Sequence, residues 1–497
     1  MMLIIYGLST LPPLCVAFVL DEVRALYTLA PILALCVFSG ILMRTFLVFE
    51  TTKVRPRMNY LTTTMIWLFM IAATSVAFYF GLTETTGIDA FFEAAAAVTT
   101  TGIGALSTSV FPYSFMLWRS ILNWIGGVGM VLIAVSCISR WGFSWQALVA
   151  TEVPGPEFLK TNVTSRKTYR YLVYIYLGLT LLDFVLLVIA GMDISDSVLT
   201  ALSNVSTAGF QHINNGDITG LSVPIKTIIT IFSFLGSINI SFFVLIMFRK
   251  FEFTGKDSET VRYLIHIVIT SVIIAAALTA GAGEAFMKSL GNALAQTVAY
   301  LSTAGYIVSD CSKLPLGCQV LILMQVFFGA CALSTGGGIK ISRVNIGART
   351  MSYDMFRHIH PHTVKPVRFN GVPLKQDQLV SANMYIGIFM LLYICGALLL
   401  SLDSKDGSVF DALCYSQAML TNTGTSIAEV SAGRVPEFSA FAKIIMAIEM
   451  LAGRLEIYPV MMLFSGAFRN AEERRYNRRE KRFGRKSRRI KSDIDWE

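Results

Sequence analysis

Long apolar runs separated by short polar segments dominate the pattern of this chain. Most of these runs approach or exceed the roughly 18–20 residues that a helix needs to cross a bilayer. They are 3–20, 27–49, 60–82, 117–139, 172–192, 224–248, 263–281, 318–333, 379–402 and 438–464. The pattern therefore predicts an all-α integral membrane protein in which each of these ten runs is one spanning helix.

Four shorter stretches lie between the two long runs of each later pair. They are moderately apolar, too short or too polar to cross, and comprise 88–99, 196–206, 286–302 and 409–421. In three of them a good N-cap residue stands at the expected helix start, namely Asp89, Ser195 and Ser408. We expect half-length helices that enter from outside and turn back, because irregular backbone is tolerated at that depth only inside protein or beside water.

Composition and charge agree with a membrane protein and predict its orientation. Of the 497 residues, 54% are hydrophobic and 15% are charged, whereas soluble domains carry about 25% charge. Lys and Arg favour the cytoplasmic side of short loops. They concentrate in 44–57, 140–170, 249–262, 340–375 and 469–497. Both termini are therefore expected in the cytoplasm, and the net charge of +9 comes mostly from the tail rather than from a nucleic-acid-binding face.

Each short stretch ends in a similar peptide. The four peptides are TTTGIG at 99–104, VSTAGF at 205–210, LSTAGY at 301–306 and TNTGTS at 421–426. A single copy is explained by a helix that ends in a glycine C′ cap. Four copies, each after a half-helix and before a full span, instead indicate a fourfold repeat of about 100 residues.

The chemistry of these peptides suits a monovalent cation, and potassium above others. Carbonyl oxygens replace the hydration shell of a potassium ion only where successive carbonyls face one axis. That backbone is accessible to glycine and costly for other residues. Threonine hydroxyls supply further oxygen atoms, and the partially negative C-terminal ends of the half-helices favour a cation.

These peptides, with CALSTGGGIKISR at 331–343 and AGRLEIYPVMMLF at 452–464, resemble the Trk/Ktr/HKT superfamily of potassium transporters. The resemblance covers essentially the whole chain and is greatest to bacterial TrkH/TrkG-type uptake subunits. It implies four helix–pore-helix–helix repeats around one pseudo-fourfold pore, preceded by two extra transmembrane helices. It also implies a homodimer in the plasma (inner) membrane that docks a cytosolic, TrkA-like ring of nucleotide-binding regulatory subunits.

This resemblance divides the chain into six segments. They are two N-terminal helices (1–57), repeat 1 (58–150), repeat 2 (151–255), repeat 3 (256–370), repeat 4 (371–468) and a basic tail (469–497). The tail is expected to lie on anionic lipid headgroups, with contact to the regulatory ring as the alternative.

Carried over by position, the resemblance assigns a potassium-binding filter residue by residue. The filter comprises Thr100, Thr101, Gly102, Thr207, Ala208, Gly209, Thr303, Ala304, Gly305, Asn422, Thr423 and Gly424. In the family, glycine at all four filter positions accompanies potassium preference, and serine in the first repeat accompanies sodium permeation. This chain has all four glycines. It departs from the family at TNTGTS, where a TNTGPG-like peptide is expected, and this departure affects what the resemblance implies for the outer mouth and not for the filter.

A glycine-rich segment interrupts the run 318–333 and continues past it. It contains Gly336, Gly337, Gly338 and Lys340. A phosphate-binding loop is excluded because the GxxxxGKS/T spacing is absent. Two interpretations stay open, a helix kink and a mobile intramembrane gate below the filter that hinges at the glycines, and the resemblance implies the gate.

A charged residue inside the last apolar run is a second candidate for the gate. Charges within membrane segments are functional hypotheses by default. The resemblance places Arg454 in the pore below the filter as an electrostatic barrier. The alternative is a structural ion pair between Arg454 and either Glu449 or Glu456.

Other functions are less well supported by the sequence. No HExxH, GxSxG or kinase pattern occurs, so an enzyme is the weakest alternative. A secondary transporter that couples cation movement to sodium or protons is a stronger one, although such folds usually have inverted or paired halves. Asp183 is interpreted as an interhelical pair, and the spacing of Cys311 and Cys318 does not decide whether they form a disulfide.

Overall fold

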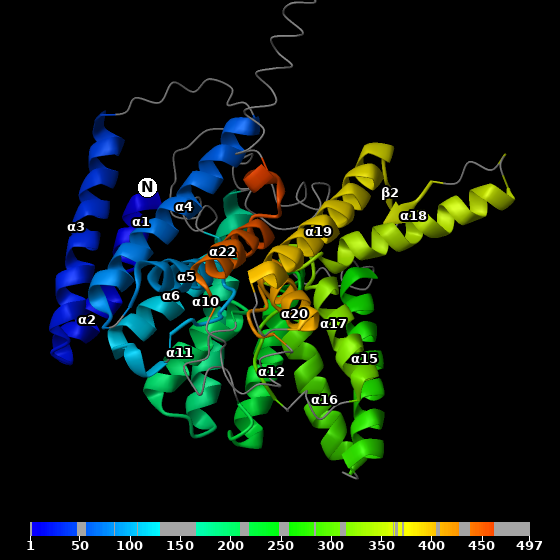
Figure 1. Cartoon of the computed structure of the whole chain (residues 1–497), viewed down its shortest axis with the longest axis horizontal. Coiled ribbons are helices and arrows are strands. Elements are labelled where there is room, and N and C mark those ends of the chain that lie inside the picture. Colours follow the sequence, from blue (N-terminus) through cyan, green and yellow to red (C-terminus); the bar gives the residue numbers. More distant parts are fainter. Residues whose placement is uncertain are drawn as a thin grey trace, which may run out of the picture.

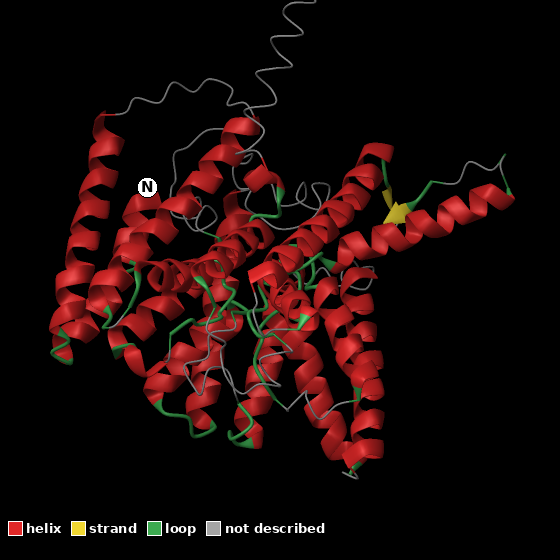
Figure 2. Ribbon diagram, viewed as in Figure 1, coloured by secondary structure: helices red, strands yellow, loops and turns green. Residues whose placement is uncertain are grey.

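The computed structural model is almost entirely helical (Figures 1 and 2). It describes residues 2–46, 56–83, 85–106, 108–129, 166–208, 218–247, 258–282, 285–308, 315–360, 362, 366–369, 372–403, 408–426 and 438–461. Within these ranges the β structure is one antiparallel pair, β1 (Arg368–Phe369) and β2 (Val372–Pro373). The basic tail and the segments 130–165 and 427–437 lie outside the described residues.

The N-terminal segment forms three helices, α1 (Met2–Leu8), α2 (Leu11–Val19) and α3 (Val23–Phe46). The first apolar run is therefore two helices rather than one. The hydroxyls of Ser9 and Thr10 donate to backbone carbonyls one turn back, at 2.6 and 2.7 Å, and Pro12 and Pro13 follow in the first turn of α2. Because proline has no backbone N–H and suits the first turn of a helix, a break at this point is favoured.

The first helix of each repeat is long, as predicted. These helices are α4 (Pro56–Gly81), α10 (Arg166–Ile189), α15 (Ser258–Ala282) and α19 (Gln376–Asp403). With the α1–α2 segment and α3, they are the six described stretches that are long and apolar enough to cross a membrane.

Four half-helices follow at the predicted positions. They are α5 (Gly87–Val98), α11 (Ile194–Val205), α16 (Phe286–Leu301) and α20 (Val409–Leu420). Ser408 is the N-cap of α20 and forms a capping box with Asp411. The predictions for Asp89 and Ser195 are wrong, because Thr86 caps α5 by accepting from the Asp89 N–H and α11 begins after Asp193.

The second helices of the repeats are shorter than predicted. They are α6 (Tyr113–Val128), α12 (Val223–Ser237), α17 (Leu316–Phe328) and α22 (Ala440–Arg454), with 16, 15, 13 and 15 residues. The chain resumes as α13 (Ile240–Met247) after α12 and as α18 (Ile341–Ile359) after α17. The interpretation of 117–139, 224–248, 318–333 and 438–464 as single spans is therefore wrong, since each helix ends near the middle of the molecule.

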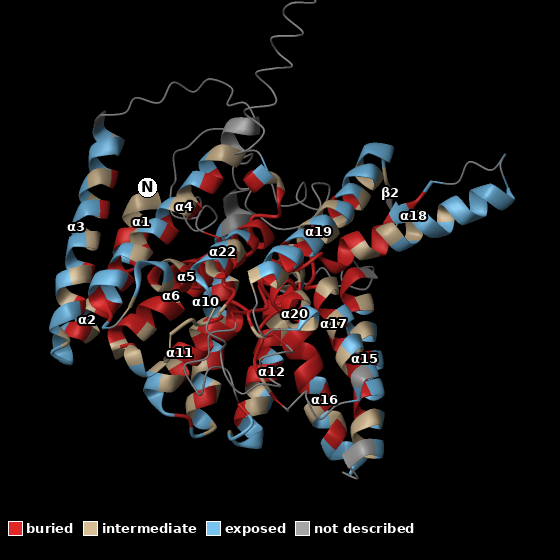
Figure 3. Ribbon diagram, viewed as in Figure 1, coloured by how far each residue is buried: buried red, intermediate tan, exposed pale blue. Residues whose placement is uncertain are grey.

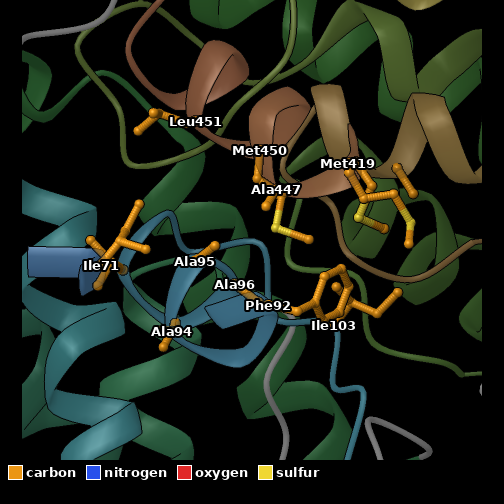
Figure 4. Close-up of a cluster of buried hydrophobic side chains, with 14 of the residues drawn as sticks. Ile71, Phe92, Ala94, Ala95, Ala96, Ile103, Met419, Ala447, Met450 and Leu451 are labelled. Atoms are coloured by element: carbon orange, nitrogen blue, oxygen red, sulfur yellow. The ribbon is translucent and has the colours of Figure 1, made fainter. Parts of the chain in front are cut away.

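The half-helices form the centre of the fold, where buried residues concentrate (Figure 3). The alanines of α5 from Ala94 to Ala97 have no exposed surface. Around them pack Met419 of α20 and Ala447 and Met450 of α22 (Figure 4). Small side chains let these backbones approach closely, which is how helices pack where no water drives their association.

Candidate ion pathway

All four half-helices end in the same backbone conformation. The residues just past each end have left-handed φ values of 59° at Thr100, 51° at Thr207, 60° at Thr303 and 57° at Asn422. In repeat 1 the N–H of Thr101 donates to Ala96 at 3.0 Å, which is the six-to-one bond of a Schellman motif. The C′ residue of each helix is therefore a threonine or an asparagine, not the glycine that the cap interpretation requires.

The filter glycines stand two residues beyond these left-handed residues and are themselves left-handed. Their φ values are 80° at Gly102, 62° at Gly305 and 76° at Gly424, and Gly209 lies outside the described residues. Positive φ thus recurs at alternate residues. Because reversing the sign of φ at every second residue turns alternate peptide planes over, successive carbonyls of such a segment face the same side. This is the backbone that a carbonyl-lined cation site requires.

The filter peptides of three repeats lie against one another. A Cβ at Gly424 would stand 1.9 Å from the Thr101 carbonyl oxygen, and one at Gly305 would stand 2.0 Å from the Thr423 carbonyl oxygen. Repeats 3, 4 and 1 are therefore consecutive around one centre. Glycine is required at these two positions both by its positive φ and by the neighbouring carbonyl.

The side chains of the filter peptides mostly bond to one another. The hydroxyls of Thr99 and Thr101 are 2.8 Å apart, and those of Thr421 and Thr423 are 2.9 Å apart. The Asn422 amide donates to the Thr101 hydroxyl at 2.9 Å and to the Met450 carbonyl at 2.8 Å. The threonines thus tie the peptides to the scaffold as well as supplying oxygen atoms.

The outer part of the fourth peptide contacts the third. The Thr425 hydroxyl donates to the Gly305 carbonyl. Thr425 belongs to the TNTGTS segment that departs from the expected family pattern. A polar side chain of repeat 4 therefore occupies one carbonyl of repeat 3 at this end of the filter.

A second set of glycines, which sequence reasoning missed, supports the filter peptides. Gly126, Gly236 and Gly453 each stand 13 residues after the first residue of α6, α12 and α22. A Cβ at these positions would meet the carbonyl oxygens of Val98, Val205 and Leu420 at 2.2, 2.7 and 2.1 Å. These carbonyls belong to the last residues of the half-helices. The recurrence of a glycine 13 residues into each second helix is a signal that the sequence contains.

In repeat 3 a glycine stands at the same position of the second helix, but it contacts a different part of the chain. Gly329 also stands 13 residues after the start of its helix, but a Cβ there would meet the Gly337 carbonyl oxygen at 2.5 Å. The segment 329–340 fills the space next to the half-helices instead. Cβ atoms at Gly336 and Gly337 would lie 2.8 Å from the Ser302 carbonyl and 2.0 Å from the Thr421 carbonyl.

This segment, called here the central loop (329–340), is buried and bonded along its length. Two backbone hydrogen bonds join this loop to the break between α12 and α13. The Cys331 N–H donates to the Ser237 carbonyl at 3.0 Å, and the Ile240 N–H donates to the Leu333 carbonyl at 3.1 Å. The Ala332 N–H donates to the Glu259 carboxylate on α15 at 2.7 Å. The kink interpretation is therefore wrong, because a folded loop separates α17 from α18.

Thr335 is the residue of the central loop that touches the filter of repeat 2. Its hydroxyl donates to the Gly236 carbonyl at 3.0 Å and lies 3.1 Å from the hydroxyl of Thr207. Nearby, the Gly337 N–H donates to the Thr303 hydroxyl at 2.8 Å. The central loop therefore bonds directly to two of the four filter peptides.

Arg454 joins the central loop to repeats 1 and 4. Its guanidinium donates to the carbonyls of Thr335 at 2.5 Å, Gly126 at 2.5 Å and Gly127 at 2.7 Å. The last two carbonyls are at the C-terminal end of α6, where the helix dipole favours a cation. Arg454 thus lies where the central loop of repeat 3 meets the ends of α6 and α22.

The carboxylates proposed as partners of Arg454 are engaged elsewhere. Glu456 forms a bidentate pair with Arg343 on α18, at 2.8 and 2.9 Å. Glu449 accepts from the Ser416 hydroxyl at 2.5 Å. Lys340, also buried, donates to the Gly336 carbonyl within its own loop. Arg454 bonds to backbone carbonyls, and among the described contacts these two carboxylates bond to Arg343 and Ser416.

Two smaller predictions are resolved by the structure. Asp183 of α10 accepts from the Asn204 amide of α11 at 2.9 Å, and Asn204 in turn accepts from Ser233 of α12. The interpretation of Asp183 as an interhelical partner is therefore confirmed. Cys318 has a free thiol, and Cys311 lies outside the described residues.

Comparison with known proteins gives one consistent assignment. Residues 33–471 match the TrkH family, which is described as cation transport protein. The potassium uptake protein TrkH of Escherichia coli (strain K12) is 28% identical over 84% of this chain and 87% of its own length, and TrkH of Halomonas elongata is 27% identical over 94% and 97%. The crystal structure of the potassium transporter TrkH from Vibrio parahaemolyticus superposes with a TM-score of 0.78 at 24% identity, covering 94% of this chain and 97% of that one. With its fourfold helical architecture and this match along most of its length, the chain belongs to the TrkH family of cation transport proteins.

Proposed function

We propose that this chain takes up potassium through one pore, with a glycine-based filter contributed by each of its four repeats. The observation that carries the proposal is the alternation of left-handed residues in the filter peptides, together with the contact of Gly424 and Gly305 with the carbonyls of the next repeat. Carbonyls that face one axis replace the hydration shell of a potassium ion. The names of the relatives, which are potassium uptake proteins, support the same cargo.

The central loop and Arg454 form the proposed gate below this filter. Gly336 and Gly337 touch the ends of two half-helices, and this contact supports the proposal that the loop closes the path of an ion from the filter. Arg454 adds a positive charge at the same level. At about 4 Å and an effective dielectric near 20, a passing cation is repelled by roughly 4 kcal/mol.

The proposed assembly is a homodimer in the plasma (inner) membrane, with both termini in the cytoplasm and one pore per chain. Each chain has four repeats and needs no partner to complete its ring. A cytosolic, TrkA-like ring of nucleotide-binding subunits is proposed to move the central loop. The long helix α18, which begins at the end of this loop and projects from the body of the molecule (Figure 1), is the element through which such a push reaches the loop.

The test of the filter is the variant Gly102→Ser, measured in a bilayer with mixed potassium and sodium. A side chain at a left-handed position disturbs the aim of the carbonyls, so we expect the preference for potassium to fall about tenfold, equivalent to about 1.4 kcal/mol. The matched control is Gly178→Ser on α10, where nothing lies within 4 Å of the added Cβ.

Unchanged reversal potentials in Gly102→Ser would refute the filter assignment. The same recordings separate a pore from coupled transport. Sustained currents that reverse near the potassium potential support the pore. Fluxes that require sodium or a proton gradient would instead support a coupled secondary transporter.

A further inference from the structure

Two half-helices reach back to the chain just beyond their own filter peptides. Glu93 of α5 and Gln296 of α16 each stand nine residues before the filter glycine of their repeat. The Oε1 atom of Glu93 accepts from the N–H of Leu106, and the Oε1 atom of Gln296 accepts from the N–H of Val308. Both distances are 3.0 Å, and both side chains are fully buried.

Each of these bonds spans a filter peptide from one end to the other. The inner end is already held by the Schellman bonds of the half-helix, such as Thr101 N–H to Ala96. The side chain of Glu93 or Gln296 holds the outer end, three or four residues after the glycine. A segment with unfavourable φ values persists only where its surroundings over-determine it. A bond across the segment supplies that constraint.

The two repeats make the same bond with different chemistry. In repeat 1 the acceptor is a carboxylate, and Arg119 of α6 lies 3.7 Å from it, above the ring of Phe111 at 4.7 Å. In repeat 3 the acceptor is a neutral amide. The residue of α17 that corresponds to Arg119, the seventh of its helix, is the buried Ile322. The bond across the filter peptide therefore does not need a charged acceptor, since Gln296 makes it with a neutral amide. The feature that the two repeats share is the acceptor oxygen.

The two bonded repeats lie on opposite sides of the ring. Filter contacts place repeat 4 between repeats 3 and 1. The corresponding residues of repeats 2 and 4 are Thr200 and Tyr415, and the positions three and four residues after those two filter glycines lie outside the described residues. Glu93 and Gln296 therefore lie in two repeats that face each other across the ring.

We propose that Glu93 and Gln296 are positioning residues that hold the outer ends of the first and third filter peptides and thereby set the cation selectivity. This proposal rests on the proposed function as a filter. It assigns a role to an acceptor oxygen behind the filter, not to a charge and not to a residue that touches the ion. Loss of the oxygen frees the outer end and removes the partner of the Leu106 N–H, which is half-buried, or of the Val308 N–H, which is buried.

The test compares two double variants that differ only in the acceptor oxygen. Glu93→Gln with Arg119→Ile gives repeat 1 the residue pair of repeat 3, and Glu93→Leu with Arg119→Ile removes the oxygen without leaving a buried charge. We expect the first to keep the wild-type reversal potential in mixed potassium and sodium. The second is expected to lose about fivefold to tenfold in preference for potassium, as one lost hydrogen bond predicts.

Gln296→Met provides the same test in repeat 3, where no charge is involved, and it keeps the proposal falsifiable if the repeat 1 variants fold poorly. Equal selectivity of the Gln and Leu double variants, or wild-type selectivity of Gln296→Met, would overturn the proposal. Gly102→Ser serves as the reference. If it shifts the reversal potential and the Leu variants do not, the filter stands and the positioning role fails. If Gly102→Ser has no effect, the filter assignment fails and the proposal fails with it.

Discussion

Repeat 3 differs from the other three repeats in what the glycine of its second helix contacts. In repeats 1, 2 and 4, a glycine of the second helix presses directly on the last carbonyl of the half-helix, within 2.1–2.7 Å of an added Cβ. In repeat 3 the equivalent Gly329 presses on Gly337 of the central loop. Among the described residues, the fourfold pattern of glycine contacts therefore differs in repeat 3, where the central loop takes the place of the half-helix end.

This difference separates a rigid support from an inserted element. Three glycine contacts are backbone against backbone, which no side-chain rotation can relieve. The central loop is held by hydrogen bonds as well, some of which end at the break in the second helix of repeat 2, at Gly236 and Ser237. Such bonds contribute about 1 kcal/mol each. Hydrogen bonds can be broken one at a time, whereas backbone contacts, including that of Gly337 with the Thr421 carbonyl, cannot be relieved in this way.

The largest effect is expected from disrupting a glycine contact between a second helix and a half-helix. An alanine at Gly126 would place its Cβ 2.2 Å from the Val98 carbonyl, so helix α6 or the filter must move. Overpacking of this kind costs about 1–3 kcal/mol. We expect Gly126→Ala to lower both folded yield and selectivity, measured by thermal unfolding and by reversal potentials. Gly329→Ala should instead displace the central loop and raise basal flux without changing selectivity.

Gly387→Ala on α19 is the control for both variants, because nothing lies within 4 Å of its added Cβ. The comparison between repeats would break down if Gly126→Ala and Gly329→Ala gave the same phenotype. A loss of selectivity in Gly329→Ala would show that the central loop supports the filter as the glycines do.

The second effect concerns the link between the loop and the scaffold. Arg454→Ala removes three hydrogen bonds and a positive charge, and deletion of Gly336–Gly338 removes the part of the loop that touches the half-helices. Both are expected to increase cation flux in liposomes and to weaken dependence on any regulatory ring. Because they act on one barrier, their effects should be less than additive.

Flux must be counted per folded molecule, since Arg454 also stabilises the end of α6. A purely structural role predicts lower yield and unchanged flux for Arg454→Ala. Glu456 remains paired with Arg343 in this variant, so no carboxylate of that pair is left buried alone. Unchanged or reduced flux in both the substitution and the deletion would contradict the gate.

The smallest effect is expected at Thr335. Thr335→Val keeps the shape of the side chain and removes the hydroxyl that donates to the Gly236 carbonyl. The loss of one buried hydrogen bond is worth about 1 kcal/mol, which corresponds to a roughly fivefold change in the equilibrium between closed and open loops. Basal flux should rise by that modest factor with selectivity unchanged. Thr335→Ser retains the hydroxyl and should behave as the wild type; a similar rise in Ser and Val variants would exclude the hydrogen bond as the cause.

Sequence patterns located the filter peptides well and explained their residues only in part. The four half-helices begin and end within two residues of the predicted bounds. Glycine was expected to provide all the unusual backbone. In the structure Thr100 and its three equivalents are also left-handed, at a cost of about 1–2 kcal/mol per residue. Neither propensity nor pattern signals a threonine in that conformation, because tertiary bonds impose it.

The second helices show where hydropathy fails. Their apolar runs are continuous, and α22 ends after Arg454 in a turn where Glu456 and Ile457 have φ values of 61° and 63°. Hydropathy records transfer from water to a membrane interior and does not record whether backbone groups bond within the helix or to another repeat. At the break between α12 and α13 the central loop supplies partners to these groups, and at the end of α6 the Arg454 side chain does so.

The sequence by itself determined the membrane class, the fourfold repeat, the half-helices and the glycine positions, because hydrophobic length and local turn chemistry are encoded over a few neighbouring residues. Only the tertiary structure decided which carbonyl each glycine faces, that Arg454 bonds to Gly126 and Gly127, and that Glu456 pairs with Arg343 rather than with Arg454. The contacts of Arg454 and Glu456 join residues more than 100 positions apart. Their geometry, like that of the glycine contacts, depends on how four separately encoded repeats close around a common centre.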